Sequence, residues 1–159
     1  MTSVPDKKSE KEKLCRYRNC LHENRVLGQD EGVMCGNLYY HTDCLKTKEE
    51  IKEIIVLFTE RINPNPIYAQ LQRVIDNIVF NKGIGSEFLL FGLRYYIDNK
   101  IPLNYPQGLY YVIQNKNMSE SYNKRKSTMM KSKIEIREEK KSTFVHIPIK
   151  HNDVSDIFK

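Results

Sequence analysis

All four cysteines of this 159-residue chain lie within a stretch of thirty residues near its N-terminus. They are Cys15, Cys20, Cys35 and Cys44, and the same stretch contains His22 and His41. It has few large aliphatic side chains, so it cannot build a hydrophobic core of its own and needs a cross-link. The N-terminal sequence MTSVPDKKSEKEKL has no apolar secretory signal, and no apolar run is long enough to span a membrane. We therefore expect a cytoplasmic protein whose cysteines bind a metal rather than form disulfides.

Two short ligand pairs predict the metal site. Cys15 and Cys20 form a C-x4-C pair, His41 and Cys44 form an H-x2-C pair, and 20 residues separate the pairs. Each pair can approach an ion from one turn, and three thiolates with one imidazole suit tetrahedral Zn2+. Because this set fills all four positions, we expect a structural Zn2+ rather than a catalytic one.

Other interpretations of the cysteine-rich stretch remain open. His22, two residues after Cys20, and Cys35, six residues before His41, are alternative ligands. H-x2-C directly before a helix is typical of treble-clef and LIM-like fingers, which favours Cys15, Cys20, His41 and Cys44 and leaves Cys35 as a buried thiol. The simplest alternative is four ordinary buried cysteines without a metal, although their clustering argues against it.

The sequence contains no arrangement typical of an active site. The cysteine-rich stretch lacks the H-x-E and P-C-x-x-C elements of zinc deaminases, and no G-x-S-x-G motif occurs. The glycine-containing segment KGIGSE, residues 82–87, lacks the GK[ST] ending of a phosphate-binding loop and is more typical of a turn between helices. We therefore predict no catalytic residues and no small-molecule substrate.

Beyond the cysteines, apolar residues recur at helical spacing. One stripe runs from Ile51 to Ile62, a second from Ile67 to Val79, and a third segment after Ser86, the expected N-cap, is apolar on nearly all sides. The sequence LYYVIQN, residues 109–115, fits either a strand or a short helix. The predicted fold is mostly α, with a small N-terminal zinc finger made of a short β-hairpin and a helix. The expected organisation is a mobile arm (1–13), the zinc finger (14–45), a helical domain (46–117) and a basic extension and tail (118–159).

The net charge of +6 arises entirely from the second half of the chain. Residues 124–141 contain eight basic and three acidic residues, and such a density can neutralise nucleic-acid phosphates. A solvated charged helix face is an equally good explanation. The residues expected to contact nucleic acid or a protein partner are Lys124, Arg125, Lys126, Lys131, Lys133 and Arg137. Tyr105, Tyr110, Tyr111 and Tyr122 are suited to stacking on bases, although tyrosines more often pack in cores.

Three segments of the chain resemble small, uncharacterised zinc-finger proteins of phages and mobile elements of low-GC Gram-positive bacteria. These segments are YYHTDC (39–44), LLFGLRYYIDNK (89–100) and GLYYVIQNKNMSESYNKRK (108–126). The first ligand pair of that family is usually C-x2-C, whereas this chain has C-x4-C. The resemblance implies a finger followed by a helical body, a phage accessory role in a bacterial host cell, and no enzymatic activity.

The favoured function is therefore a non-enzymatic, zinc-stabilised protein that binds nucleic acid or a nucleoprotein complex through residues 124–141. The alternative is an inhibitor or adaptor of a host system, such as an anti-defence or anti-CRISPR-like protein, that acts through protein–protein contacts. A metal-dependent nuclease is a third possibility, and it would need metal ligands beyond those that the sequence offers.

Overall fold

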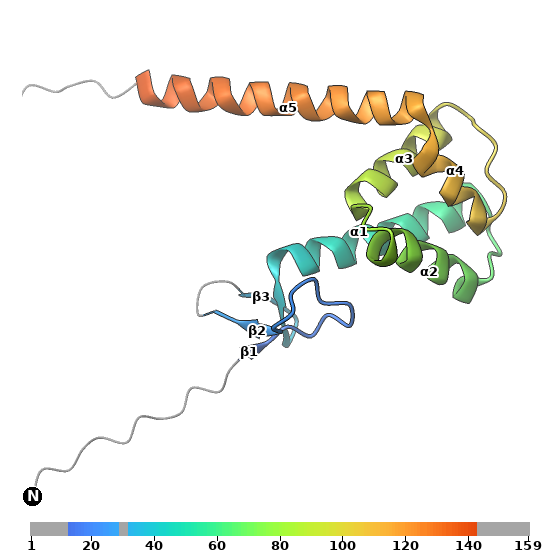
Figure 1. Ribbon diagram of the computed structural model, residues 1–159, viewed down its shortest axis with the longest axis horizontal. Coiled ribbons are helices and arrows are strands. Elements are labelled where there is room, and N and C mark those ends of the chain that lie inside the picture. Colours follow the sequence, from blue (N-terminus) through green and yellow to red (C-terminus); the bar gives the residue numbers. More distant parts are fainter. Residues whose placement is uncertain (1–12, 29–31, 143–159) are drawn as a thin grey trace, which may run out of the picture. The chain divides into compact units, whose positions relative to one another are not determined.

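The computed structural model describes residues 13–28 and 32–142, with side chains described through Ser132. In this part of the chain a small N-terminal β-containing module precedes a set of helices, which confirms the predicted fold class (Figure 1). The chain divides into two compact units, Met1–Tyr122 and Asn123–Lys159. The finer boundaries predicted from the sequence remain predictions. The arm before Lys13, the strand-like segment at 144–149 and the C-terminal tail lie outside the described residues.

The N-terminal module, called the finger here (13–28 and 32–45), contains two small antiparallel sheets. β1 (Lys13–Leu14) pairs with β2 (Val26–Leu27), and β3 (Gly32–Cys35) pairs with β4 (Leu38–His41). Gly36 and Asn37 connect β3 to β4, and Gly36 has a φ of +62°. A glycine in this conformation at the first position of a two-residue turn is typical of a type II′ hairpin, whose twist matches that of the strands. The hairpin therefore delivers His41 directly to the start of the next helix.

Helix α1 (Thr42–Arg61) belongs to both the finger and the helical body. Its first turn carries Cys44 into the finger, whereas Ile51, Ile54 and Phe58 are buried further along the helix. These three residues follow the i, i+3, i+7 spacing of one helical face, as the sequence pattern predicts. The helix ends before the segment NPNP at 63–66, where proline cannot continue it.

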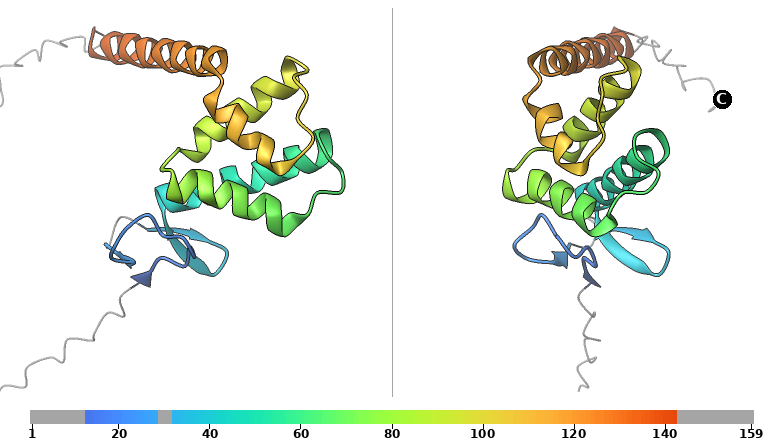
Figure 2. Two further views of the ribbon diagram at one scale, coloured as in Figure 1. Left: turned by 45° about the vertical axis from the view of Figure 1, so that its right-hand side comes forward. Right: turned by 90° about the vertical axis from the view of Figure 1, so that its right-hand side faces the viewer.

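The helical body comprises α1 and the helices that follow it up to Tyr122 (Figure 2). α2 (Tyr68–Asp76) runs directly into a π-helical turn, η1 (Asn77–Asn81), and α3 (Ser86–Asp98) follows after a turn. A 3-10 turn, η2 (Pro106–Gly108), leads into α4 (Leu109–Gln114), and α5 (Lys116–Ser142) begins after one further residue. The residues 109–115, which the sequence leaves open between strand and helix, are therefore mostly helical.

α3 lies at the centre of the body, as its apolar sequence predicts. Leu89 and Leu93 are fully buried on it. At Gly92 a β-carbon would lie 2.6 Å from Val112 Cγ1 and 3.1 Å from Met118 Cε, so this glycine permits the close approach of α4 and the start of α5. The expected N-cap at Ser86 is wrong. Gly85 is the N-cap, and Ser86 Oγ instead donates a 2.5 Å hydrogen bond to Glu50 Oε2 of α1.

Candidate metal centre

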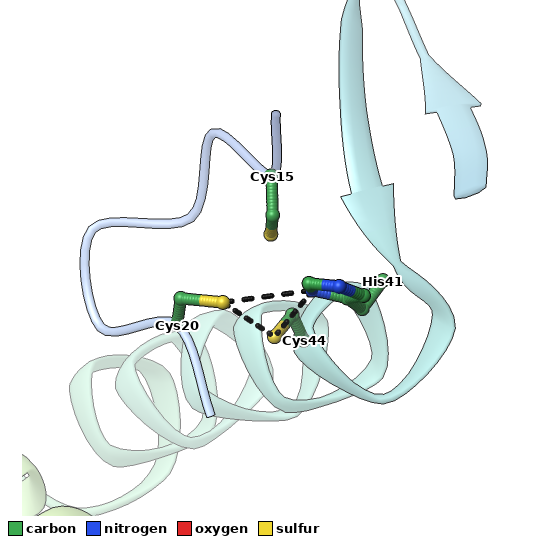
Figure 3. A group of neighbouring side chains, drawn as sticks. All are labelled: Cys15, Cys20, His41 and Cys44. Carbon is green, nitrogen blue, oxygen red and sulfur yellow. Dashed lines mark hydrogen bonds between the residues drawn. The ribbon is translucent and has the colours of Figure 1, made fainter. Parts of the chain in front are cut away.

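Three elements of the finger bring four potential ligands together (Figure 3). Cys15 directly follows β1, and Cys20 lies in the loop that leads to β2. His41 is the last residue of β4, and Cys44 lies in the first turn of α1. Backbone hydrogen bonds hold the loop in place: the Cys15 N–H donates to the Arg25 carbonyl at 2.7 Å, and the Arg16 N–H donates to the Tyr39 carbonyl at 2.9 Å. The hydrogen bond from Arg16 to Tyr39 of β4 thus joins the two halves of the site.

The ligand atoms of the four residues point at a common centre. The Sγ atoms of Cys15, Cys20 and Cys44 and a ring nitrogen of His41 all lie within 4.8 Å of one another. Cys20 Sγ is 3.8 Å from Cys44 Sγ, and His41 Nδ1 is 3.5 Å from Cys20 Sγ and 3.8 Å from Cys44 Sγ. Three thiols and one imidazole in this arrangement could hold a metal ion. The set is the one predicted from the spacing of the sequence.

The protein environment of the thiols differs from one to the next. Cys15 is 1% exposed and Cys44 is fully buried. Burial and the neighbouring Cys20 and Cys15 thiols raise the pKa of Cys44 to about 12, although the Leu21 N–H, 3.4 Å from Cys44 Sγ, acts in the opposite direction. At Cys15 burial also opposes ionisation, but hydrogen bonds from the backbone of His41 and Tyr17, together with those of the Cys20 and Cys44 side chains, outweigh it and lower the pKa. Several thiolates packed this closely repel one another, and a cation among them would remove that repulsion.

A histidine and a carboxylate that the sequence analysis did not pair lie beside the four ligands. His22 Nε2 donates to both carboxylate oxygens of Asp43, at 3.1 and 3.0 Å, and this hydrogen bond lowers the pKa of Asp43. The His22 ring also lies against the His41 ring, with 3.9 Å between centroids. Both members of the pair are substantially exposed. The sequence contains the information needed to predict this pair, because His22 and Asp43 each lie within two residues of a predicted ligand. When the ligands gather around one centre, these two side chains also come close to each other.

Cys35 corrects a prediction. The sequence suggested a buried thiol, but Cys35 is exposed, at the end of β3 and next to the hairpin turn. Cys35 pairs with Leu38 at the turn end of the hairpin, whereas His41 pairs with Gly32 at the opposite end. Cys35 is therefore not among the residues that gather at the centre.

The predicted nucleic-acid contacts lie on α5. Lys124, Arg125, Lys126 and Lys131 are exposed there, as is every residue from Asn123 to Ser132. The backbone of Lys133 and Arg137 is helical, and their side chains lie outside the described part of the chain. Among the tyrosines proposed for stacking, Tyr105 and Tyr111 are each 72% exposed. Tyr122 instead packs edge-on against Phe88 and Phe91, with ring centroids 5.0 and 5.3 Å apart.

Comparisons with family models, with curated proteins and with solved structures find no match for this chain. The resemblance to phage finger proteins stays a prediction. None of the helices between residues 13 and 142 has the length and apolar character needed to cross a membrane.

Proposed function

We propose that Cys15, Cys20, His41 and Cys44 bind a structural Zn2+, and the observation that carries this proposal is the spacing of their ligand atoms. With Zn–S bonds of about 2.3 Å and a Zn–N bond of about 2.0–2.1 Å, a tetrahedral site holds its sulfurs about 3.8 Å apart and its sulfur and nitrogen about 3.6 Å apart. The 3.8 Å between the sulfurs of Cys20 and Cys44, and the 3.5 and 3.8 Å from these sulfurs to His41 Nδ1, agree with those edges. Cys15 Sγ, the fourth ligand atom, lies within 4.8 Å of the other three.

A structural role follows from the number and kind of ligands. Four protein ligands complete a tetrahedron, whereas a hydrolytic Zn2+ keeps one position for water. The role of the metal is then to hold β1, the following loop, β4 and α1 together, and the protein is a binding protein rather than an enzyme.

Zinc binding is tested by Co2+ titration of the metal-depleted protein. Binding by three thiolates should produce the charge-transfer and d–d absorption of a tetrahedral Cys3His site, and one equivalent of Zn2+ should displace the Co2+. Cys44→Ser should weaken binding strongly, whereas Cys35→Ser, which changes an exposed cysteine outside the centre, should not. An octahedral Co2+ spectrum, or equal effects of the two variants, would contradict the proposed ligand set.

The proposed partner is nucleic acid, bound through the basic residues of α5. In the described part of this helix Lys124, Arg125, Lys126 and Lys131 are exposed, and the helix has no buried face between Asn123 and Ser132. A helix segment whose described side chains are exposed and rich in cations is typical of a surface that meets a polyanion. The predicted phage accessory role is compatible with this function.

Salt dependence provides the test. If four cations each contact a phosphate, the slope of log K against log salt is about −3.6 on duplex DNA, so affinity falls roughly 100-fold between about 50 and 200 mM salt. A double variant Lys124→Gln/Lys126→Gln should reduce the slope by about 1.8. Lys52→Gln is the matched control, because Lys52 is an exposed lysine on α1. Absence of binding at low salt to any DNA or RNA would refute the proposal.

A second candidate, an inhibitor or adaptor that binds a host protein, is favoured by the β3–β4 hairpin. Met34 is 63% exposed, and Leu38 and Val33 are 45% and 39% exposed. Apolar side chains concentrated on one exposed hairpin suit a protein interface better than a phosphate backbone. Recovery of a host protein from nuclease-treated lysate that is lost with Met34→Asp would support this candidate over the first.

A further inference from the structure

Three open hollows adjoin one another along the connection between α3 and α4. The central hollow, of about 440 Å³, is lined by Tyr96, Tyr105 and Tyr111 and by residues of the loop at 101–108. A second, of about 250 Å³, shares Tyr96 and Leu103 with it, and a third, of about 400 Å³, shares Gln107 and Tyr111. Neighbouring hollows have lining residues in common, and the three together are called the loop groove here.

Basic and amide groups surround the tyrosines of the loop groove. Arg61 and Lys100 line one end, and Lys82 lines the other, where its Nζ lies 4.8 Å from the centre of the Tyr110 ring. No acidic residue is among those described as lining the three hollows. The side-chain amides of Asn104, Gln107 and Gln114 add hydrogen-bond donors and acceptors. The groove therefore complements a ligand with negative charge and flat apolar groups.

Lys100 adopts a backbone conformation that favours glycine. Its φ is 54°, and it follows Asn99, the C-cap of α3. Its N–H donates to the Ile97 carbonyl at 3.1 Å, and the next N–H, of Ile101, donates to the Tyr96 carbonyl at 2.9 Å. This is the hydrogen-bond pattern of a Schellman motif, in which glycine usually occupies the position of Lys100. A lysine at this position costs folding free energy relative to glycine, and this lysine lines the groove.

Two exposed tyrosines give the loop groove aromatic surfaces in addition to its basic groups. Tyr105 and Tyr111 are each 72% exposed, so little of either ring is used in the core. Such rings can stack on any unpaired base, whereas the bases of a duplex are already stacked on one another. Cations interleaved with exposed aromatic rings are typical of surfaces that bind single strands.

We propose that the loop groove binds single-stranded nucleic acid, with Tyr105 and Tyr111 stacking on bases and Arg61, Lys100 and Lys82 contacting phosphates. This inference rests on the proposed nucleic-acid function. It adds that the nucleic acid is single-stranded and that a second contact surface lies in the unit that ends at Tyr122. Single-stranded DNA and RNA both have phosphates and exposed base faces, so the proposed contacts can form with either.

The test uses the full-length, zinc-loaded protein and fluorescence anisotropy with three labelled probes: oligo(dT), oligo(rU), each of about 15 nucleotides, and a duplex of similar length. Tighter binding to a single strand than to the duplex is expected, and the first two probes separate DNA from RNA. Tyr111→Ala should raise the Kd for the single strand about fivefold or more. Tyr111→Phe should retain affinity, because stacking needs only the ring. Tyr68→Ala is the control, since Tyr68 is a 60% exposed tyrosine that lines none of the three hollows.

Lys100→Gly separates binding from folding. Glycine suits the left-handed conformation, so the melting temperature should stay equal or rise, while loss of one phosphate contact should reduce the salt slope for the single strand by about 0.7. The groove proposal is overturned if Tyr111→Ala and Lys100→Gly bind like the wild type while the α5 variants do not, a result that leaves the proposed function intact. It is also overturned if the groove captures a proline-rich or apolar peptide that oligonucleotides do not displace. If the wild-type protein binds none of the probes, both proposals fail.

Discussion

Removal of the metal should unfold the finger and leave the helical body folded. The perturbation is exhaustive chelation of the zinc-loaded protein. In the finger, Leu27 and Tyr40 are the buried hydrophobic residues apart from Cys15 and Cys44. Two such side chains contribute roughly 3–6 kcal/mol by burial, which is too little to order a module of this length. The body, in contrast, has its own cluster of buried residues from Ile51 to Met118.

The expected size of the effect follows from zinc affinity. Structural Zn2+ contributes about 10–16 kcal/mol of apparent binding free energy in small fingers at neutral pH, which is as large as the whole stability of a typical domain. If the zinc-loaded finger is held closed by only about 5 kcal/mol, chelation should accelerate amide exchange in it at least about a thousandfold. The Cys15 and Arg16 amides, which donate to the Arg25 and Tyr39 carbonyls, report this opening directly.

Hydrogen exchange read by mass spectrometry or NMR measures both parts of the protein in one experiment. Amides of α3 around Leu89 and Leu93 should change by less than about tenfold, because that helix belongs to the core of the body. Cys44→Ser should reproduce the effect of chelation, and Cys35→Ser should not. Protection of the Cys15 and Arg16 amides that survives chelation would refute the reasoning, and so would an equal loss of protection in α3.

Three further predictions concern packing and pH. Gly92→Ala should destabilise the body by about 1–3 kcal/mol in urea unfolding, because the new methyl group would overlap Val112, 2.6 Å away; an unchanged midpoint would show that α4 can move aside. Burial, followed by the charges of Asp76 and Cys44, raises the pKa of Tyr17 to about 12, so its contribution to stability is present below pH 10 and lost as pH rises towards 12. Tyr17→Phe should therefore lose less stability over that range than the wild type, and equal losses would contradict this assignment. Zinc retention should fall as pH drops from about 7 to 5, because protons compete for the thiolates and the imidazole, and a chromogenic chelator can follow the release.

The spacing of the four residues was sufficient to predict from the sequence which side chains come together at the candidate metal centre. Cys15 and Cys20 lie in one loop, and His41 and Cys44 span one strand–helix junction, so each pair is set by local chain geometry. The helical body was likewise predictable, because the apolar periodicity of α1 and α2 is a local signal.

Tertiary structure decided the features that depend on contacts distant in sequence. Residues 109–114 form a helix that buries Leu109 and Val112, three residues apart, in the body. The sequence of this segment alone fits a strand equally well, so the choice depends on these tertiary contacts. The exposure of Cys35 depends on which end of the hairpin it occupies. Tyr122 packs against Phe88, whereas Tyr105 and Tyr111 are exposed, and the sequence around each tyrosine does not indicate which of them lies at the surface. Burial is a property of the assembled neighbours, whereas ligand spacing is a property of the chain itself.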